Sequence, residues 1–126
     1  MQCNCTQLGM VRFGIILVNG PYQSQRWETA YHIAHSALEL SDKVTFFLFM
    51  DGVYNVLRTE HFPAMKKVPK DYFIELIDKG AEVYACEVCT NNRGLEAGKN
   101  YLEGIRIAGA PVASEMVSKC DRIITL

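Results

Sequence analysis

The chain has 126 residues, of which 49% are apolar and 21% are charged. This composition suits a single folded domain and excludes an intrinsically disordered chain, because enough apolar surface is available to build a core. Thirteen basic and fourteen acidic residues give a formal charge of −1, so we expect no direct binding to nucleic acid.

Long apolar segments and targeting signals are not recognisable in the chain. No apolar run approaches the ~20 residues that span a bilayer, so we expect no membrane segment. No basic segment followed by a long apolar stretch precedes Asn19, which favours a cytoplasmic protein over a secreted one. In a reducing compartment, an odd number of unevenly spaced cysteines is typical of reactive, metal-bound or buried thiols. The five cysteines are Cys3, Cys5, Cys86, Cys89 and Cys120.

The first part of the chain predicts a leader, a strand and a helix. Residues 1–10 show no periodicity and are interpreted as a loose leader, so that 11–126 form the single domain. Val11–Val18 is a short, β-branched apolar run that predicts a buried strand, and a turn follows at Asn19-Gly20-Pro21. From Gln25–Leu40 the apolar residues recur with helical spacing, which predicts a helix.

The middle of the chain repeats this alternation. Val44–Met50 predicts a second buried strand, and Val53–Arg58 predicts a short helix. Asp71–Lys79 has helical periodicity, and Gly80 follows it at the position where a left-handed residue commonly ends a helix. Ala81–Ala85 predicts a third strand.

The last third predicts two more strands and a sheet that is mostly parallel. A helical turn is expected from Cys86 to Asn92, a strand over Gly104–Gly109, a helix over Ala110–Lys119 and a strand over Asp121–Leu126. Strands that alternate with helices imply parallel crossover connections, with helices on both faces of the sheet. We therefore expect the α/β class, as a flavodoxin-like three-layer α/β/α fold with a mostly parallel five-stranded sheet.

Cys86 has the most informative position among the cysteines. It leaves a predicted strand at its carboxyl end, where parallel sheets gather their ligands, and it enters a predicted helix. The free N–H groups and partial positive charge of a helix start favour thiolate over thiol, which lowers the pKa of a cysteine and makes its sulfur a nucleophile. The competing interpretation is a buried and inert cysteine.

Cys89 follows three residues later and completes a C-x-x-C spacing. This spacing is typical of a dithiol/disulfide pair and also of half a zinc site, for which Cys3 and Cys5 are the remaining candidate ligands. A C-x-C pair in a loose leader is an unusual source of zinc ligands, so we expect no metal. Cys89 facing the core is the remaining interpretation.

Sequence motifs for nucleotide binding and for serine hydrolysis are absent. The chain has no G-x-x-x-x-G-K-[ST] loop, no G-x-G-x-x-G after the first strand and no G-x-S-x-G elbow. His32 and His35 share a polar helix face with Glu28 but lack the H-E-x-x-H spacing of a zinc site, so we interpret them as solvated. We therefore expect no cofactor.

Four segments, in this order and spacing, carry a resemblance to a known family. They are VRFGIILVNGPYQSQ at the opening strand, Gly52-Val53-Tyr54-Asn55, CEVCTNNRG from Cys86 to Gly94, and Cys120-Asp121-Arg122-Ile123-Ile124. Over about residues 11–126 the chain resembles the DsrE/TusD group of sulfur-relay proteins, also described as DsrE/DsrF-like.

The resemblance implies a chemistry for Cys86. It implies that this residue carries a persulfide, accepting sulfane sulfur from a donor protein or small sulfur compound and passing it to a partner. We then expect Cys86 to be the catalytic residue, in a pocket walled by the strand ends and by Arg93, whose charge would suit an anionic donor. The expected pocket residues are Gly20, Tyr22, Gly52, Tyr54 and Arg93. Cys89 is a candidate resolving thiol, because a thiol one turn from a persulfide can attack it.

The resemblance also implies a homo-oligomer, as a trimer or hexamer. Aromatic residues in or beside predicted loops favour the same conclusion, because exposed aromatic clusters usually mark interfaces. These residues are Tyr22, Phe62, Tyr72 and Tyr101.

A cytoplasmic sulfur carrier or sulfurtransferase is therefore the leading hypothesis, and two others stay open. The first is a dithiol oxidoreductase or persulfide reductase that uses Cys86 together with Cys89. The second is a non-catalytic, oligomeric binding subunit.

Overall fold

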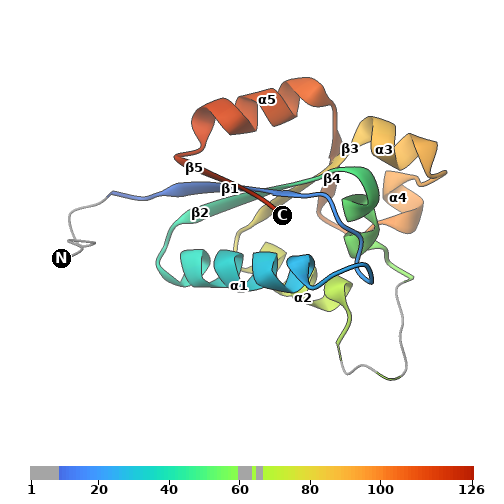
Figure 1. Ribbon diagram of the computed structural model, residues 1–126, viewed down its shortest axis with the longest axis horizontal. Helices are drawn as coiled ribbons and strands as arrows, with labels where there is room; N and C mark the ends of the chain where they lie inside the picture. Colours follow the sequence, from blue (N-terminus) through green and yellow to red (C-terminus); the bar gives the residue numbers. More distant parts are fainter. Residues whose placement is uncertain (1–8, 60–63, 65–66) are drawn as a thin grey trace.

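A five-stranded sheet forms the centre of the protein. The computed structural model describes residues 9–59, 64 and 67–126. All neighbouring strands are parallel, and their order across the sheet is β4-β3-β2-β1-β5. The strands are β1 (Arg12–Leu17), β2 (Lys43–Leu48), β3 (Glu82–Cys86), β4 (Ile105–Ala108) and β5 (Arg122–Thr125). The chain thus moves outward from β1 to β4 and returns to place β5 on the other side of β1 (Figure 1).

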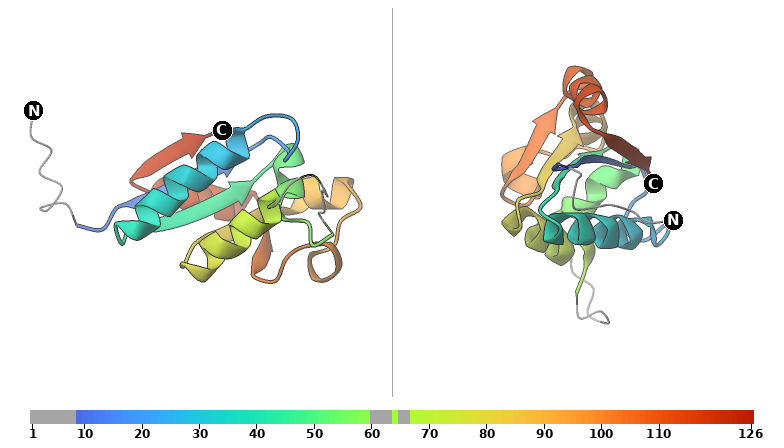
Figure 2. Two further views of the ribbon diagram at one scale, coloured as in Figure 1. Left: turned by 90° about the horizontal axis from the view of Figure 1, so that it is seen from below. Right: turned by 90° about the vertical axis from the view of Figure 1, so that its left-hand side faces the viewer.

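Helices cover both faces of the sheet. The longer helices α1 (Arg26–Glu39) and α2 (Pro69–Asp78) lie on one face, and α5 (Ala110–Lys119) lies on the other (Figures 1 and 2). Three short elements gather near the carboxyl ends of the strands: the 3₁₀ helix η2 (Met50–Val56), α3 (Glu87–Asn92) and α4 (Ala97–Asn100). This arrangement confirms the predicted three-layer, flavodoxin-like α/β/α fold.

The burial of the strands explains why their apolar sequences could be recognised as strands. The side chains of Ile15, Leu17, Phe46, Phe47 and Leu48 are fully buried. β2 lies between two other strands and between two helical layers, so apolar side chains point to both of its faces and Phe46–Leu48 forms a continuous apolar run. On α1 the buried face agrees with the expected helical spacing: Trp27, Ala30, Tyr31, Ala34 and Ala37.

The element boundaries differ from the predictions at one informative place. The second strand was expected to continue to Met50 but ends at Leu48, and the following helix begins at Met50 instead of Val53. Met50 has a positive φ of 51°, a left-handed conformation that cannot continue an extended strand. The short helix α4 occupies a segment to which the sequence assigned no element. Most of the predicted leader, residues 1–8, lies outside the described residues.

Gly52 sets how closely η2 approaches β1. Its N–H donates to the carbonyl oxygens of Val18 (3.0 Å) and Phe49 (2.8 Å). A Cβ atom added to Gly52 would lie 2.1 Å from the carbonyl oxygen of Leu17, so only glycine fits here. The loops after β1 and β2 are therefore held together by backbone contact. None of the helices in the described residues is long and apolar enough to cross a bilayer.

Candidate functional site

Cys86 ends β3 and is also the residue that caps α3. Its Sγ accepts a hydrogen bond from the backbone N–H of Cys89 at 3.5 Å. The backbone N–H groups of Cys89 and Val88 both act to lower the pKa of this thiol. The side chain is 8% exposed, so the sulfur sits at the boundary of the core. The predicted strand-to-helix position of this thiol is confirmed.

The expected lowering of the Cys86 pKa is wrong for the resting thiol. Burial raises the pKa of Cys86 and outweighs the N–H groups of Cys89 and Val88, which lower it. Hydrogen bonding and charge repulsion between the thiols of Cys86 and Cys89 raise this pKa further. The physical reason is that α3 has only six residues, whereas the loss of water around a buried sulfur penalises its charged form directly. The resting thiol is therefore mostly protonated at neutral pH.

Cys89 is held by the neighbouring loop. It lies on α3, is 8% exposed, and its Sγ accepts a hydrogen bond from the backbone N–H of Met50 at 3.1 Å. This bond links the start of η2 to the helix that follows β3, across 39 residues of sequence. Both thiols of the C-x-x-C segment thus have a defined N–H donor.

Arg93 binds a carboxylate that sequence reasoning did not assign to it. Its Nε and Nη2 donate to Oδ1 of Asp51 at 3.0 and 2.9 Å, and its Nη1 donates to the carbonyl oxygen of Cys89 at 3.0 Å. The guanidinium also lies over the ring of Tyr54, 5.9 Å from its centre. The hydrogen bonds to Asp51 raise the pKa of Arg93. Its charge is therefore balanced within the protein, and its direct contacts hold α3 against η2.

The same carboxylate extends the network to the first strand. Gln23 donates from Nε2 to Oδ2 of Asp51 at 3.1 Å, and its Oε1 accepts from the N–H of Gly20 at 2.7 Å. A second link is the fully buried Asn55, whose Nδ2 donates to the carbonyl oxygens of Asn19 (2.9 Å) and Gly52 (2.8 Å). The ends of β1, β2 and β3 are thus joined by polar contacts.

A hydrogen bond between Thr90 and Tyr101 attaches α3 to the core. Their side-chain oxygens are 2.8 Å apart in the core, and burial raises the pKa of Tyr101. Sequence reasoning expected Tyr101 among residues near the surface, but it is fully buried. Of the other aromatic residues expected there, Tyr22 is 60% exposed and Tyr72 is half-buried, whereas Phe62 lies outside the described residues.

Three of the five residues expected to line a pocket at Cys86 line one common cavity. Gly20, Tyr22 and Tyr54 line one cavity of about 290 Å³, together with Pro21, Gln23, Asp51 and Leu57. The other two expected residues take different places: Gly52 packs on the backbone of β1, and Arg93 covers Tyr54. Among the described residues, Cys86 does not line this cavity.

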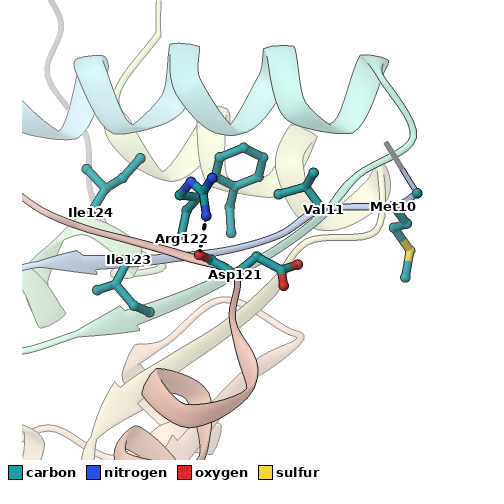
Figure 3. Close-up of a pocket in the computed structure, with 8 residues that line it drawn as sticks. Met10, Val11, Asp121, Arg122, Ile123 and Ile124 are labelled. Atoms are coloured by element: carbon teal, nitrogen blue, oxygen red, sulfur yellow. Dashed lines mark hydrogen bonds between the residues drawn. The ribbon is translucent and has the colours of Figure 1, made fainter. Parts of the chain in front are cut away.

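A larger hollow of about 580 Å³ is lined by residues of β5 and the start of β1 (Figure 3). The starts of these two strands lie away from α3 (Figure 1). Met10, Val11 and Asp121 lie at its amino-terminal side, and Ile123 and Ile124 point to opposite sides of β5 (Figure 3). Arg122 donates to the carbonyl oxygen of Asp121. Because ligands of parallel sheets usually bind at the carboxyl ends of strands, this hollow is not assigned to the candidate site.

Metal-binding arrangements are not found among the residues that the structure describes: no three His, Cys, Asp or Glu side chains are grouped to hold an ion. Cys3 and Cys5, the candidate ligands of the zinc site that the sequence argued against, lie outside those residues. His32 lies 4.0 Å from Glu28 on the same helix, and His35 lies 3.8 Å from both Glu39 and Glu75. These histidines have carboxylate neighbours on an exposed or half-exposed helix surface.

Comparisons with known proteins agree with the fold and extend it to a family. The model of the DsrE/DsrF-like family matches residues 12–126. "Uncharacterized protein MJ0760" of Methanocaldococcus jannaschii is 34% identical over 109 residues, which are 83% of this chain and 39% of that protein. "Putative sulfurtransferase DsrE" of Allochromatium vinosum is 26% identical over 126 residues, covering 90% of this chain and 97% of that protein.

A solved structure with a similar fold is the ychN protein from E. coli. It has a TM-score of 0.84 and 21% sequence identity, and the match covers 93% of this chain and all of that one. At this identity the likeness concerns the fold. This chain spans about two fifths of the length of the M. jannaschii relative but nearly the whole of the A. vinosum protein.

Proposed function

The chain belongs to the DsrE/DsrF-like family, and from this we propose that it is a sulfur carrier or sulfurtransferase whose working thiol is Cys86. The observation that carries the proposal is the position of this sulfur at the end of β3, under the N–H groups of Val88 and Cys89. Reactive groups of parallel α/β proteins gather at this edge of the sheet.

The proposed chemistry moves one sulfur atom in two exchanges. The thiolate of Cys86 attacks the sulfane sulfur of a persulfide or polysulfide donor, forms a new S–S bond, and releases the donor's thiolate with the electron pair of the old bond. The thiolate of an acceptor then attacks the outer sulfur on Cys86. This step forms the acceptor persulfide and returns Cys86 to a thiolate, so no cofactor or outside oxidant is needed.

The surroundings of Cys86 support exchange with other molecules. Val88, in the first turn of α3, is 63% exposed, and Met50 is 55% exposed. Exposed apolar side chains next to this buried C-x-x-C segment favour contact with a donor or acceptor over free access by water. We propose that its partners are donor and acceptor proteins or small sulfur compounds. We also propose that it works in a reducing cytoplasm and as a homo-oligomer.

The test is sulfur loading followed by peptide mapping. Trypsin releases Cys86 and Cys89 together in the peptide 80–93, whereas Cys120 and the leader cysteines fall in other peptides. After incubation with inorganic polysulfide or tetrathionate, we expect this peptide to gain a sulfur or thiosulfonate adduct. Cys86→Ser abolishes the adduct and Cys120→Ser, the control, leaves it intact. Full loading of Cys86→Ser would refute the assignment.

The pH dependence follows from the direction of the pKa shift. Because burial raises the pKa of Cys86, only a small fraction is thiolate at neutral pH. The loading rate should therefore rise about tenfold per pH unit from neutral pH until the pKa is reached. A rate that is already independent of pH at pH 7 would contradict this.

The sulfur-loading test also separates the two remaining hypotheses. An oxidoreductase changes the mass of the peptide by two hydrogens without adding sulfur, and a binding subunit does neither.

A further inference from the structure

Cys86 and Cys89 are arranged as a pair that can close a disulfide. They are the capping residue and the third residue of α3, and the N–H of one already contacts the sulfur of the other at 3.5 Å. Residues three apart on a helix have Cβ atoms about 5–6 Å apart, and a disulfide joins Cβ atoms about 3.5–4.5 Å apart, so closing the bond brings the two side chains about 1–2 Å closer. The Cys89 thiol is also one of the groups that raise the pKa of Cys86, so the two sulfurs lie near each other.

The position of the Cys89 sulfur is set by the start of η2 as well as by α3. The N–H of Met50 that contacts it belongs to a residue with a positive φ of 51°. The flanking backbone is fixed, because Phe49 donates to the carbonyl oxygen of Leu17 at 3.0 Å and Gly52 donates to that of Val18 at 3.0 Å. A non-glycine residue in this conformation is uncommon, and here it directs an amide donor at a thiol. This donor fixes the position of the Cys89 sulfur beside Cys86.

We propose that Cys89 resolves the persulfide on Cys86, releasing hydrogen sulfide and leaving a Cys86–Cys89 disulfide; this rests on the proposed function of Cys86 as a sulfur acceptor. The Cys89 thiolate attacks Sγ of Cys86. A bond forms between the two cysteine sulfurs, the persulfide S–S bond breaks, and the outer sulfur leaves with its electron pair as hydrosulfide.

The electrons balance within this step. The outer sulfane sulfur is reduced to sulfide, and the two cysteine sulfurs are oxidised to a disulfide. The proton lost by the Cys89 thiol is balanced by protonation of the hydrosulfide. An external dithiol then reduces the disulfide and is itself oxidised to a disulfide, which restores both cysteines.

Access decides between this step and onward transfer. Cys89 is buried beside Cys86 and reaches the inner sulfur, whereas an acceptor arriving from solvent meets the outer sulfur first. With an acceptor present, sulfur is passed on; without one, Cys89 discharges the sulfur as sulfide. The protein would therefore act as a carrier or as a persulfide reductase depending on its partners.

The experiment follows the loaded protein after the donor is removed. Full-length protein is loaded with inorganic polysulfide under anaerobic conditions and desalted, and sulfide release and the mass of peptide 80–93 are followed with time. In the wild type we expect about one sulfide per loaded chain, and a peptide two hydrogens lighter than the reduced form. Cys89→Ser and Cys89→Ala should keep the extra sulfur at least about tenfold longer, and Cys120→Ser should behave as the wild type.

The outcomes separate the inference from the function on which it rests. If the wild type keeps its extra sulfur as long as both Cys89 variants do and forms no disulfide, the resolving role is refuted while the carrier function stands. If neither the wild type nor the Cys89 variants gain sulfur, the carrier function fails. Loss of loading in both Cys89 variants, with circular dichroism unchanged, would also refute the resolving role, because Cys89 would then be needed for the first step.

Discussion

Gly52→Ala tests the close approach on which the site is built. The added Cβ would lie 2.1 Å from the carbonyl oxygen of Leu17 and 2.9 Å from its carbonyl carbon. Both atoms belong to the backbone of β1, a strand paired on both sides, so neither can rotate out of the way. To accommodate the methyl group, η2 must move away from β1, and the N–H bonds of Gly52 to Val18 and Phe49 must lengthen.

The expected cost is large for a single methyl group. Forcing extra atoms into a well-packed site usually costs about 1–3 kcal/mol, and a clash with backbone should lie at or above the upper end, about 3 kcal/mol. For a domain of this size, each 1 kcal/mol lowers Tm by roughly 4 °C, so we expect a decrease of roughly 12 °C. The shift of η2 should also loosen the contact between Met50 and Cys89.

The assay is thermal unfolding followed by circular dichroism, with Gly98→Ala as the matched control. Gly98 lies in α4, and a Cβ added there meets no atom within 4 Å. Alanine should therefore leave the free energy of unfolding unchanged or raise it by up to about 1 kcal/mol, and Tm should stay the same or rise accordingly. A Gly52→Ala protein that melts within a few degrees of the wild type would refute the argument that this contact is tight.

Two further predictions concern the support of α3 and the assembly of the protein. Thr90→Val leaves the buried hydroxyl of Tyr101 without its partner and should lower the free energy of unfolding by about 1–3 kcal/mol. Adding Tyr101→Phe should then cost less than the two single changes predict, because both partners are removed, and strict additivity in denaturant unfolding would contradict the bond. Light scattering at micromolar concentration should give a multiple of the 14.2 kDa chain mass, three or six copies, and a monomer would contradict the proposed homo-oligomer.

Local patterns in the sequence determined the elements and their order. The apolar runs that became β1 and β2 were readable because these inner strands are buried on both faces. Gly80 was placed correctly after α2, and it has the positive φ of 107° that this position requires. The position of Cys86 between a strand and a helix follows from the same alternation. Each of these features depends on residues within a few positions of one another.

The contacts around the thiols were decided only by the tertiary structure. Asp51 and Arg93 are 42 residues apart, and the N–H of Met50 meets a sulfur 39 residues away. Such contacts add nothing to a local period of two or 3.6 residues, so no pattern in the sequence reveals them. The sign of the Cys86 pKa shift is also a tertiary property. Helix position argues for a lower pKa, but the water lost on burial raises it, and burial is known only once every neighbouring element is in place.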